Sequence, residues 1–148
     1  MAVLFSAASF FGVQAETISS AKTTIAYPVD GTLNELLAAK EVRRYVYLRS
    51  GQLLDVKPVA SLPASDGLIV VAANGSTLLA SLRDSIGYEP TEGQTLLKSV
   101  AADGRNILVV SGADADSTLL AAYRYAEKIG VGFDLAGDTI PDRKIRLS

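Results

Sequence analysis

The 16 acidic residues offer the most obvious chemistry in this chain, because paired carboxylates act as acid and base when glycosidic bonds are hydrolysed. Their number alone discriminates nothing between functions. The most suggestive group is Asp134, Asp138 and Asp142, which lie near the last predicted strand. Aspartates are also frequent turn formers and solvating groups. We favour that structural interpretation over a catalytic one.

Cysteine and histidine are both absent from the sequence. Thiol catalysis, disulfides, Ser-His-Asp triads and metal sites built on either residue are therefore excluded. Asp114 and Asp116 precede a predicted helix, where a carboxylate accepts from the free amides of the first turn. We interpret them as helix caps, because a calcium loop needs more oxygen ligands at alternating spacing. The sequence thus predicts no catalytic residue, no metal and no cofactor.

Two motifs suggest anion binding only weakly. Lys40, Arg43 and Arg44 form a basic cluster that would suit an anion or a uronate, although a solvated helix face explains it better. Asn74-Gly75-Ser76 resembles a phosphate-binding turn between strand and helix. It lacks the Gly-Lys-Ser/Thr ending and the dinucleotide glycine triplet, so we interpret it as an ordinary turn. A net charge of -2 also argues against a nucleic-acid-binding patch.

Sugar-binding modules commonly stack a sugar ring on an exposed aromatic side chain, yet this sequence has no tryptophan. Tyr45 and Tyr123 fall on apolar helix faces and are predicted to be core residues. The other tyrosines form no pattern: Tyr27, Tyr47, Tyr88 and Tyr125. The sequence therefore does not predict a stand-alone lectin.

The stretch from Asn106 to Pro141 must position any site near the C-terminus. Residues 107–110 are β-branched-rich and apolar, which indicates a buried strand. A helix follows whose apolar residues recur at intervals of three and four: Leu119, Ala122, Tyr123, Ala126 and Ile129. Gly130 supplies its C-terminal cap. A further strand is predicted over residues 131–135.

The first half of the chain supplies further strands and helices. Residues 23–27 and 68–72 read as strands, and residues 53–65, which contain Pro58 and Pro63, as a connecting loop with at most a brief strand at its start. Thr32 and Glu35 form a capping box. The helix that follows should run to about Arg49 and bury one side: Ala38, Ala39, Val42, Tyr45 and Val46.

A second helix is predicted from Ser76 or Thr77 to about Ile86, followed by a strand over residues 94–101. Asp103-Gly104 then predicts a hairpin turn into the strand at Asn106. The resulting order is β-α-β-α-β-β-α-β. It predicts an α/β fold (α+β in some schemes) with two layers, a mixed, mainly parallel sheet and a layer of helices. At 148 residues, with 49% apolar and 20% charged residues, the chain suits one folded domain.

Residues 1–15 resemble the apolar region of a secretory signal peptide, with small residues before a cleavage site after Ala15. The usual basic region is missing, and a buried N-terminal strand or helix is the alternative. The segment is too short to span a membrane. We expect export to a bacterial periplasm or cell surface, and a single domain over residues 16–148.

The segment from Gly112 to Pro141 resembles the end of the small N-terminal α/β domain of multidomain glycoside hydrolases. The α-glucuronidases and the hexosaminidase-type enzymes (their second domain) are the most similar. The resemblance rests on nine positions: Gly112, Leu119, Tyr123, Ile129, Gly130, Val131, Phe133, Asp138 and Pro141. Asp116-Ser117 departs from the Arg-Gly that the family often has early in this helix. A looser resemblance covers residues 25–141.

The resemblance implies a non-catalytic accessory domain of an exported glycoside hydrolase that degrades polysaccharides. Its partner would be a catalytic barrel later in the same chain, which would supply the catalytic acids and the contact with carbohydrate. The candidate interface with that barrel comprises five residues: Phe133, Leu135, Asp138, Ile140 and Pro141. The alternative is a stand-alone periplasmic binding or interaction module. An exposed apolar patch would favour the accessory domain, and a closed polar surface with a deep pocket would favour the module.

Overall fold

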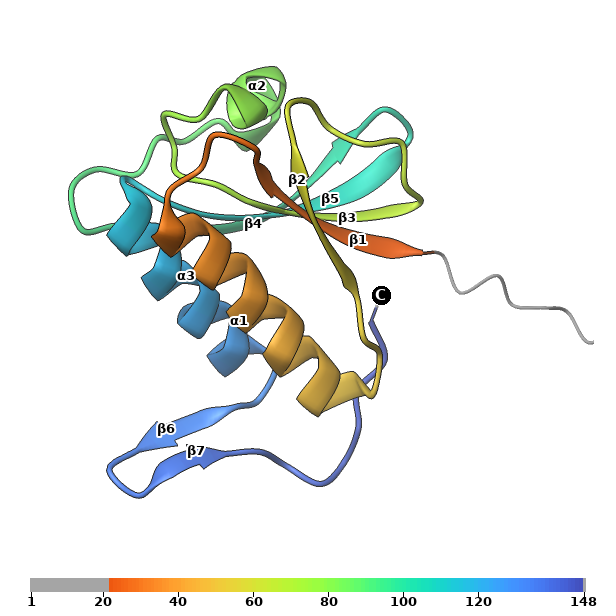
Figure 1. Cartoon of the computed structure of the whole chain (residues 1–148), viewed down its shortest axis with the longest axis vertical. Coiled ribbons are helices and arrows are strands. Elements are labelled where there is room, and N and C mark those ends of the chain that lie inside the picture. Colours follow the sequence, from red (N-terminus) through yellow and green to blue (C-terminus); the bar gives the residue numbers. More distant parts are fainter. Residues whose placement is uncertain (1–21, 148) are drawn as a thin grey trace, which may run out of the picture.

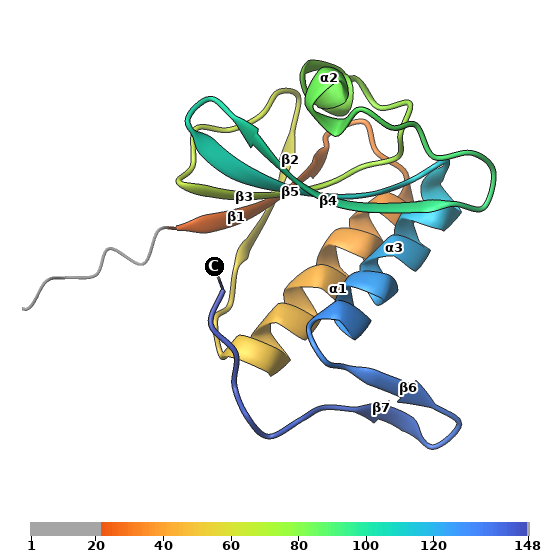
Figure 2. The ribbon, with the colours of Figure 1, turned by 180° about the vertical axis from the view of Figure 1, so that it is seen from behind.

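The computed structural model describes residues 22–147. The expected signal segment, residues 1–15, lies outside the described residues, as does the start of the expected domain 16–148. In the described part, a mixed sheet carries two long helices on one face and a short helical segment on the other (Figures 1 and 2). The predicted α/β class, with a mostly parallel sheet, is confirmed.

Among the described residues, the main sheet has five strands in the order β2-β1-β3-β5-β4. Their bounds are β1 (Thr23–Pro28), β2 (Asp55–Val59), β3 (Gly67–Val71), β4 (Thr95–Ala102) and β5 (Arg105–Gly112). The first four in this order run parallel, and β4 is antiparallel to β5 at one edge. The expected Asp103-Gly104 hairpin joins β4 to β5, and both turn residues have positive φ (53° and 74°), as a type I′ turn requires.

Strand β2 lies where the sequence predicts mainly a connecting loop. It pairs only with β1, and its position at the edge of the sheet explains why Pro58 is tolerated, since an edge strand has one side free of ladder hydrogen bonds. The two prolines of this stretch made the strand hard to predict. The residues of β2 are mostly exposed, and the strand lacks the apolar run that identifies β3.

Helices α1 (Leu33–Ser50) and α3 (Ala115–Lys128) lie side by side on one face of the sheet and run in the same direction (Figures 1 and 2). The predicted capping box of Thr32 and Glu35 begins α1. Asp114 begins α3 by accepting from the Ser117 amide at 2.8 Å. The side of α1 that was predicted to be buried is buried: Ala38, Ala39, Val42, Tyr45 and Val46. None of the helices in residues 22–147 is long and apolar enough to cross a membrane.

The predicted second helix is shorter and differently built. Ser76 caps a 3₁₀ helix, η1 (Thr77–Leu82), and α2 (Arg83–Ile86) adds a single α-helical turn. This segment covers the face of the sheet opposite α1 and α3, instead of joining them in one layer (Figure 1).

The core consists of two apolar layers, one on each face of the sheet. Successive residues of β3 alternate between them: Leu68 and Val70 pack towards η1 and α2, whereas Ile69 and Val71 pack towards α1 and α3. Strand β5 alternates in the same way. This period of two explains the continuous apolar runs of both strands, which are buried on two faces.

The predicted last strand forms a separate hairpin instead of extending the main sheet. Strands β6 (Gly132–Asp134) and β7 (Gly137–Thr139) pair with each other in a two-stranded sheet. Figure 1 shows this hairpin beyond the C-terminal ends of α1 and α3, far from the main sheet. Gly137 and Asp138, which follow the predicted strand over residues 131–135, belong to β7.

Candidate functional site

Three aromatic rings hold the β6–β7 hairpin against the helices. Tyr45 of α1, Tyr123 of α3 and Phe133 of β6 meet edge to face, with ring centroids 5.6–6.3 Å apart. Such contacts add about 0.5–1.5 kcal/mol per pair beyond the burial of their area. Because Tyr45 is 1% exposed, this aromatic trio anchors the hairpin to the interior.

A polar network at the rim of the aromatic trio fixes the position of β7. The Tyr45 hydroxyl donates to Asp138 Oδ2 at 2.6 Å, and Arg44 donates to the same carboxylate oxygen at 3.3 Å. Arg44 also pairs with Glu41 and donates to the Tyr45 oxygen. Burial, together with the hydrogen bond to Asp138, raises the pKa of Tyr45 to about 12. The hydroxyl therefore stays protonated as a donor over the physiological range.

Arg49 ties the segment after the hairpin to the end of α1. Its guanidinium donates to the carbonyls of Ile129 (2.6 Å), Pro141 (2.9 Å) and Arg143 (2.7 Å), and its side chain is almost completely buried. The Ile145 amide in turn donates a hydrogen bond to the Arg49 carbonyl at 2.8 Å. The chain from residue 140 to 147 is thus bound back against α1. Its signal in the sequence is that Arg49 continues the buried stripe of α1, three and four residues after Val46 and Tyr45.

The five candidate interface residues divide into two groups. Leu135, at the tip of the hairpin, is fully exposed, and Phe133 keeps 38% of its surface exposed. The others serve the domain itself: Asp138 binds Tyr45, Ile140 packs beneath the hairpin and the Pro141 carbonyl accepts from Arg49. Leu135 and the outer side of Phe133 remain available to a partner.

Exposed leucines extend this surface along the two helices. Asn34 of α1 donates to Asp116 of α3 at 2.5 Å, so the two helices touch at this pair. Leu37 and Leu120 lie one turn further along each helix on the same side, and they are 41% and 43% exposed. Three residues after Leu120, Tyr123 reaches Phe133. We call this surface the helix-pair face: Leu33, Leu37, Leu120, Phe133 and Leu135.

The three suggestive aspartates have separate structural surroundings. Asp134 accepts from the Ala136 amide within the hairpin turn, at 2.7 Å. Asp138 belongs to the Tyr45 network, and Asp142 is exposed. In the described part of the chain, no group of three or more acidic residues has the geometry to hold a metal ion. The basic residues likewise do not form one anion site. Arg44 forms ion pairs with Glu41 and Asp138, whereas Lys40 is exposed.

The crevice at the carboxyl ends of β1 and β3 is where open α/β sheets commonly bind anions, since the chain leaves these neighbouring strands in opposite directions. The Glu35 carboxylate fills it here. Its oxygens accept from the amides of Thr32 and Ala73, both at 2.8 Å, and the side chain is 5% exposed. A hollow of about 240 Å³ remains beside Gly75 and Ser76. An internal carboxylate, that of Glu35, thus accepts the amide hydrogens at this crevice beside the Asn74-Gly75-Ser76 turn.

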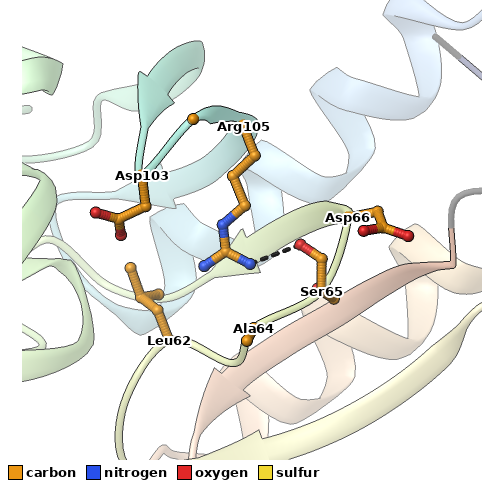
Figure 3. Close-up of a pocket in the computed structure, with 7 residues that line it drawn as sticks. Leu62, Ala64, Ser65, Asp66, Asp103 and Arg105 are labelled. Atoms are coloured by element: carbon orange, nitrogen blue, oxygen red, sulfur yellow. Dashed lines mark hydrogen bonds between the residues drawn. The ribbon is translucent and has the colours of Figure 1, made fainter.

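A larger hollow, of about 520 Å³, opens at the other end of the strands (Figure 3). The loop before β3 and the β4–β5 turn form its walls, and Arg105 reaches across it. The lining residues are Leu62, Ala64, Ser65, Asp66, Asp103, Gly104 and Arg105. Nothing in the local sequence pattern identifies Arg105, apart from its position directly after the predicted Asp-Gly turn.

No protein-family model matches this chain, and no characterised protein is significantly similar to it in sequence.

Proposed function

We propose that this chain is a non-catalytic accessory domain of an exported glycoside hydrolase, and that it packs against the catalytic barrel of its parent. The observation that carries the proposal is the helix-pair face. Leu37 of α1, Leu120 of α3 and Leu135 of the hairpin each expose apolar surface, and the two helices and the hairpin that carry them are neighbours in the fold (Figure 1). Neighbouring exposed apolar residues of this kind usually mark a surface that a partner covers.

The anchoring of the hairpin supports the same proposal. Phe133 is held by Tyr45 and Tyr123, and the segment after β7 is fixed by Arg49. A rigid exit segment would set the orientation of a following domain, which a free linker would not do. The catalytic acids, the substrate and the linkage specificity would then belong to the barrel.

The helix-pair face can be tested on the chain itself. The double variant Leu37→Glu/Leu120→Glu should bind less of a fluorescent apolar-surface dye and self-associate less at high concentration. Its free energy of unfolding should change by no more than about 0.5 kcal/mol, because both side chains point outward. Leu53→Glu/Tyr88→Glu is a charge-matched control, since both residues are exposed and lie outside this face.

If both double variants reduce dye binding equally, the helix-pair face binds apolar groups no better than the rest of the surface does. The docking proposal then loses its main support. The alternative, a stand-alone periplasmic binding module, would then be preferred. The hollow beside Arg105 is the feature that favours that alternative.

A further inference from the structure

Arg105 begins β5 at the amino-terminal edge of the sheet and lies partly buried between two loops. One terminal nitrogen, Nη1, donates to the carbonyls of Pro63 (2.5 Å) and Ser65 (2.7 Å). These two bonds hold the loop before β3 against the β4–β5 turn, as Figure 3 shows for Ser65. The guanidinium is therefore fixed in place before any ligand arrives.

The rest of the Arg105 guanidinium has unused donors. Its Nε is buried without a hydrogen-bond partner, and Nη2 has none either among the described residues. No carboxylate in residues 22–147 forms an ion pair with it. Nη2 is the unpartnered donor that is not buried, so a hydrogen-bond acceptor in the hollow can reach it and would stabilise this partly buried cation.

Two carboxylates flank the same hollow. Asp66 and Asp103 lie on opposite sides of Arg105 in Figure 3, and neither forms a hydrogen bond or an ion pair with a described residue. Carboxylates accept hydrogen bonds and repel anions. A ligand that contacts all three groups would offer hydroxyl donors to the exposed aspartates and an oxygen acceptor to Arg105, and an uncharged ligand would avoid repulsion by the two carboxylates.

We propose that this hollow, the Arg105 pocket, binds an uncharged sugar ring. Neighbouring hydroxyls of such a ring both donate and accept, and its C–H groups suit the apolar side chains of Leu62 and Ala64. The Arg105 pocket has a volume of about 520 Å³, which falls within the range of small-molecule sites. This goes beyond the proposed function, because the accessory domain itself would contact carbohydrate. It depends only on the pocket, so it stands or falls separately from docking through the helix-pair face.

The test is a titration of the ¹⁵N-labelled full chain with D-glucose and with D-xylose, followed by amide and arginine Nε chemical shifts. D-Glucuronate and acetate serve as anionic probes. We expect saturable shifts with a neutral sugar at Arg105 Nε and at the amides of Asp66 and Gly104. The variant Asp66→Asn/Asp103→Asn should weaken that binding by roughly five- to tenfold. Asparagine also tolerates the positive φ of residue 103.

Asp142→Asn is the matched control, because Asp142 is exposed and lies outside the pocket. It should leave sugar binding unchanged. The proposal is overturned if neither neutral sugar causes saturable shifts up to roughly 50 mM. It is equally overturned if glucuronate or acetate binds the unmodified chain more tightly than glucose and xylose, which would identify an anion site. Equal effects of the pocket variant and of Asp142→Asn would also contradict it.

Discussion

Gly112 is the residue at which β5 comes into closest contact with α3. A methyl group added at its Cα would collide with the backbone of Ser117 and Thr118. The Gly112 amide also donates to the Thr118 hydroxyl oxygen at 3.1 Å, which joins the end of β5 directly to the first turn of α3. The small residue at the end of this strand is therefore a packing requirement of the strand–helix unit.

We accordingly predict that Gly112→Ala lowers the free energy of unfolding by roughly 1–3 kcal/mol, as overpacking of a rigid site does. Chemical denaturation measures the change. Gly75→Ala is the matched control, because nothing lies within 4 Å of the position its Cβ would take. Equal stability of the two variants would show that β5 and α3 can separate at little cost.

Tyr45 makes the free energy of unfolding depend on pH in the alkaline range. Its pKa is raised to about 12 in the folded protein, against 10.0 for a free tyrosine. The unfolded chain therefore loses the proton first as the pH rises. The stability that Tyr45 confers is fully present below pH 10 and is lost as the pH rises towards 12.

The comparison with Tyr45→Phe isolates this effect. The stability difference between the wild type and the variant should stay constant from pH 7 to pH 9 and shrink above pH 10. Urea denaturation over this series provides the measurement. A difference that stays constant, or grows, above pH 10 would mean that burial and the bond to Asp138 do not hold the proton on Tyr45.

At the scale of elements, the hairpin and the segment after it depend on Arg49. Arg49→Met should remove three bonds to carbonyls and lower the free energy of unfolding by roughly 2–3 kcal/mol. Trypsin should also cleave after Arg143 and Lys144 faster, because this segment would leave α1 more often. Arg43→Met serves as the control, being partly exposed on the same helix. Similar cleavage rates for both variants would contradict the role of Arg49.

The elements that could be predicted are those whose signal is local. The capping box of Thr32 and Glu35, the Asp103-Gly104 turn and the apolar run of β3 each identified their element, because neighbouring residues determine them. Strand β2 was predicted only as a brief strand at the start of a loop, and the β6–β7 hairpin was predicted only as a single last strand, since distant partners decide both. Phe133 packs on Tyr45 and Tyr123, residues 88 and 10 positions away in the chain, and no local pattern records that contact.

The candidate site was predictable only in part, for the same reason. Phe133 and Leu135 were selected from a resemblance and are exposed on the hairpin. Leu37 and Leu120 were not selected, because exposure on a helix becomes visible only when both helices are placed. Arg105 matters through its carbonyl contacts and its missing counter-ion, neither of which the sequence displays.

For the whole molecule, the two surfaces lie in different places. The helix-pair face runs over α1, α3 and the hairpin, whereas the Arg105 pocket opens at the amino-terminal edge of the sheet (Figures 1 and 3). A barrel docked on the helices would leave this pocket accessible. We therefore expect Leu37→Glu/Leu120→Glu to bind neutral sugars as the wild type does, measured by the same titration. Loss of sugar binding in that variant would show that the two surfaces are coupled.

We propose that the chain is the accessory domain of a glycoside hydrolase, and sequencing the coding DNA downstream of codon 148 tests this proposal most directly. We expect an open frame that continues into a (β/α)₈-type repeat with paired catalytic carboxylates. A stop codon directly after Ser148, with no hydrolase frame beside it, would contradict the claim.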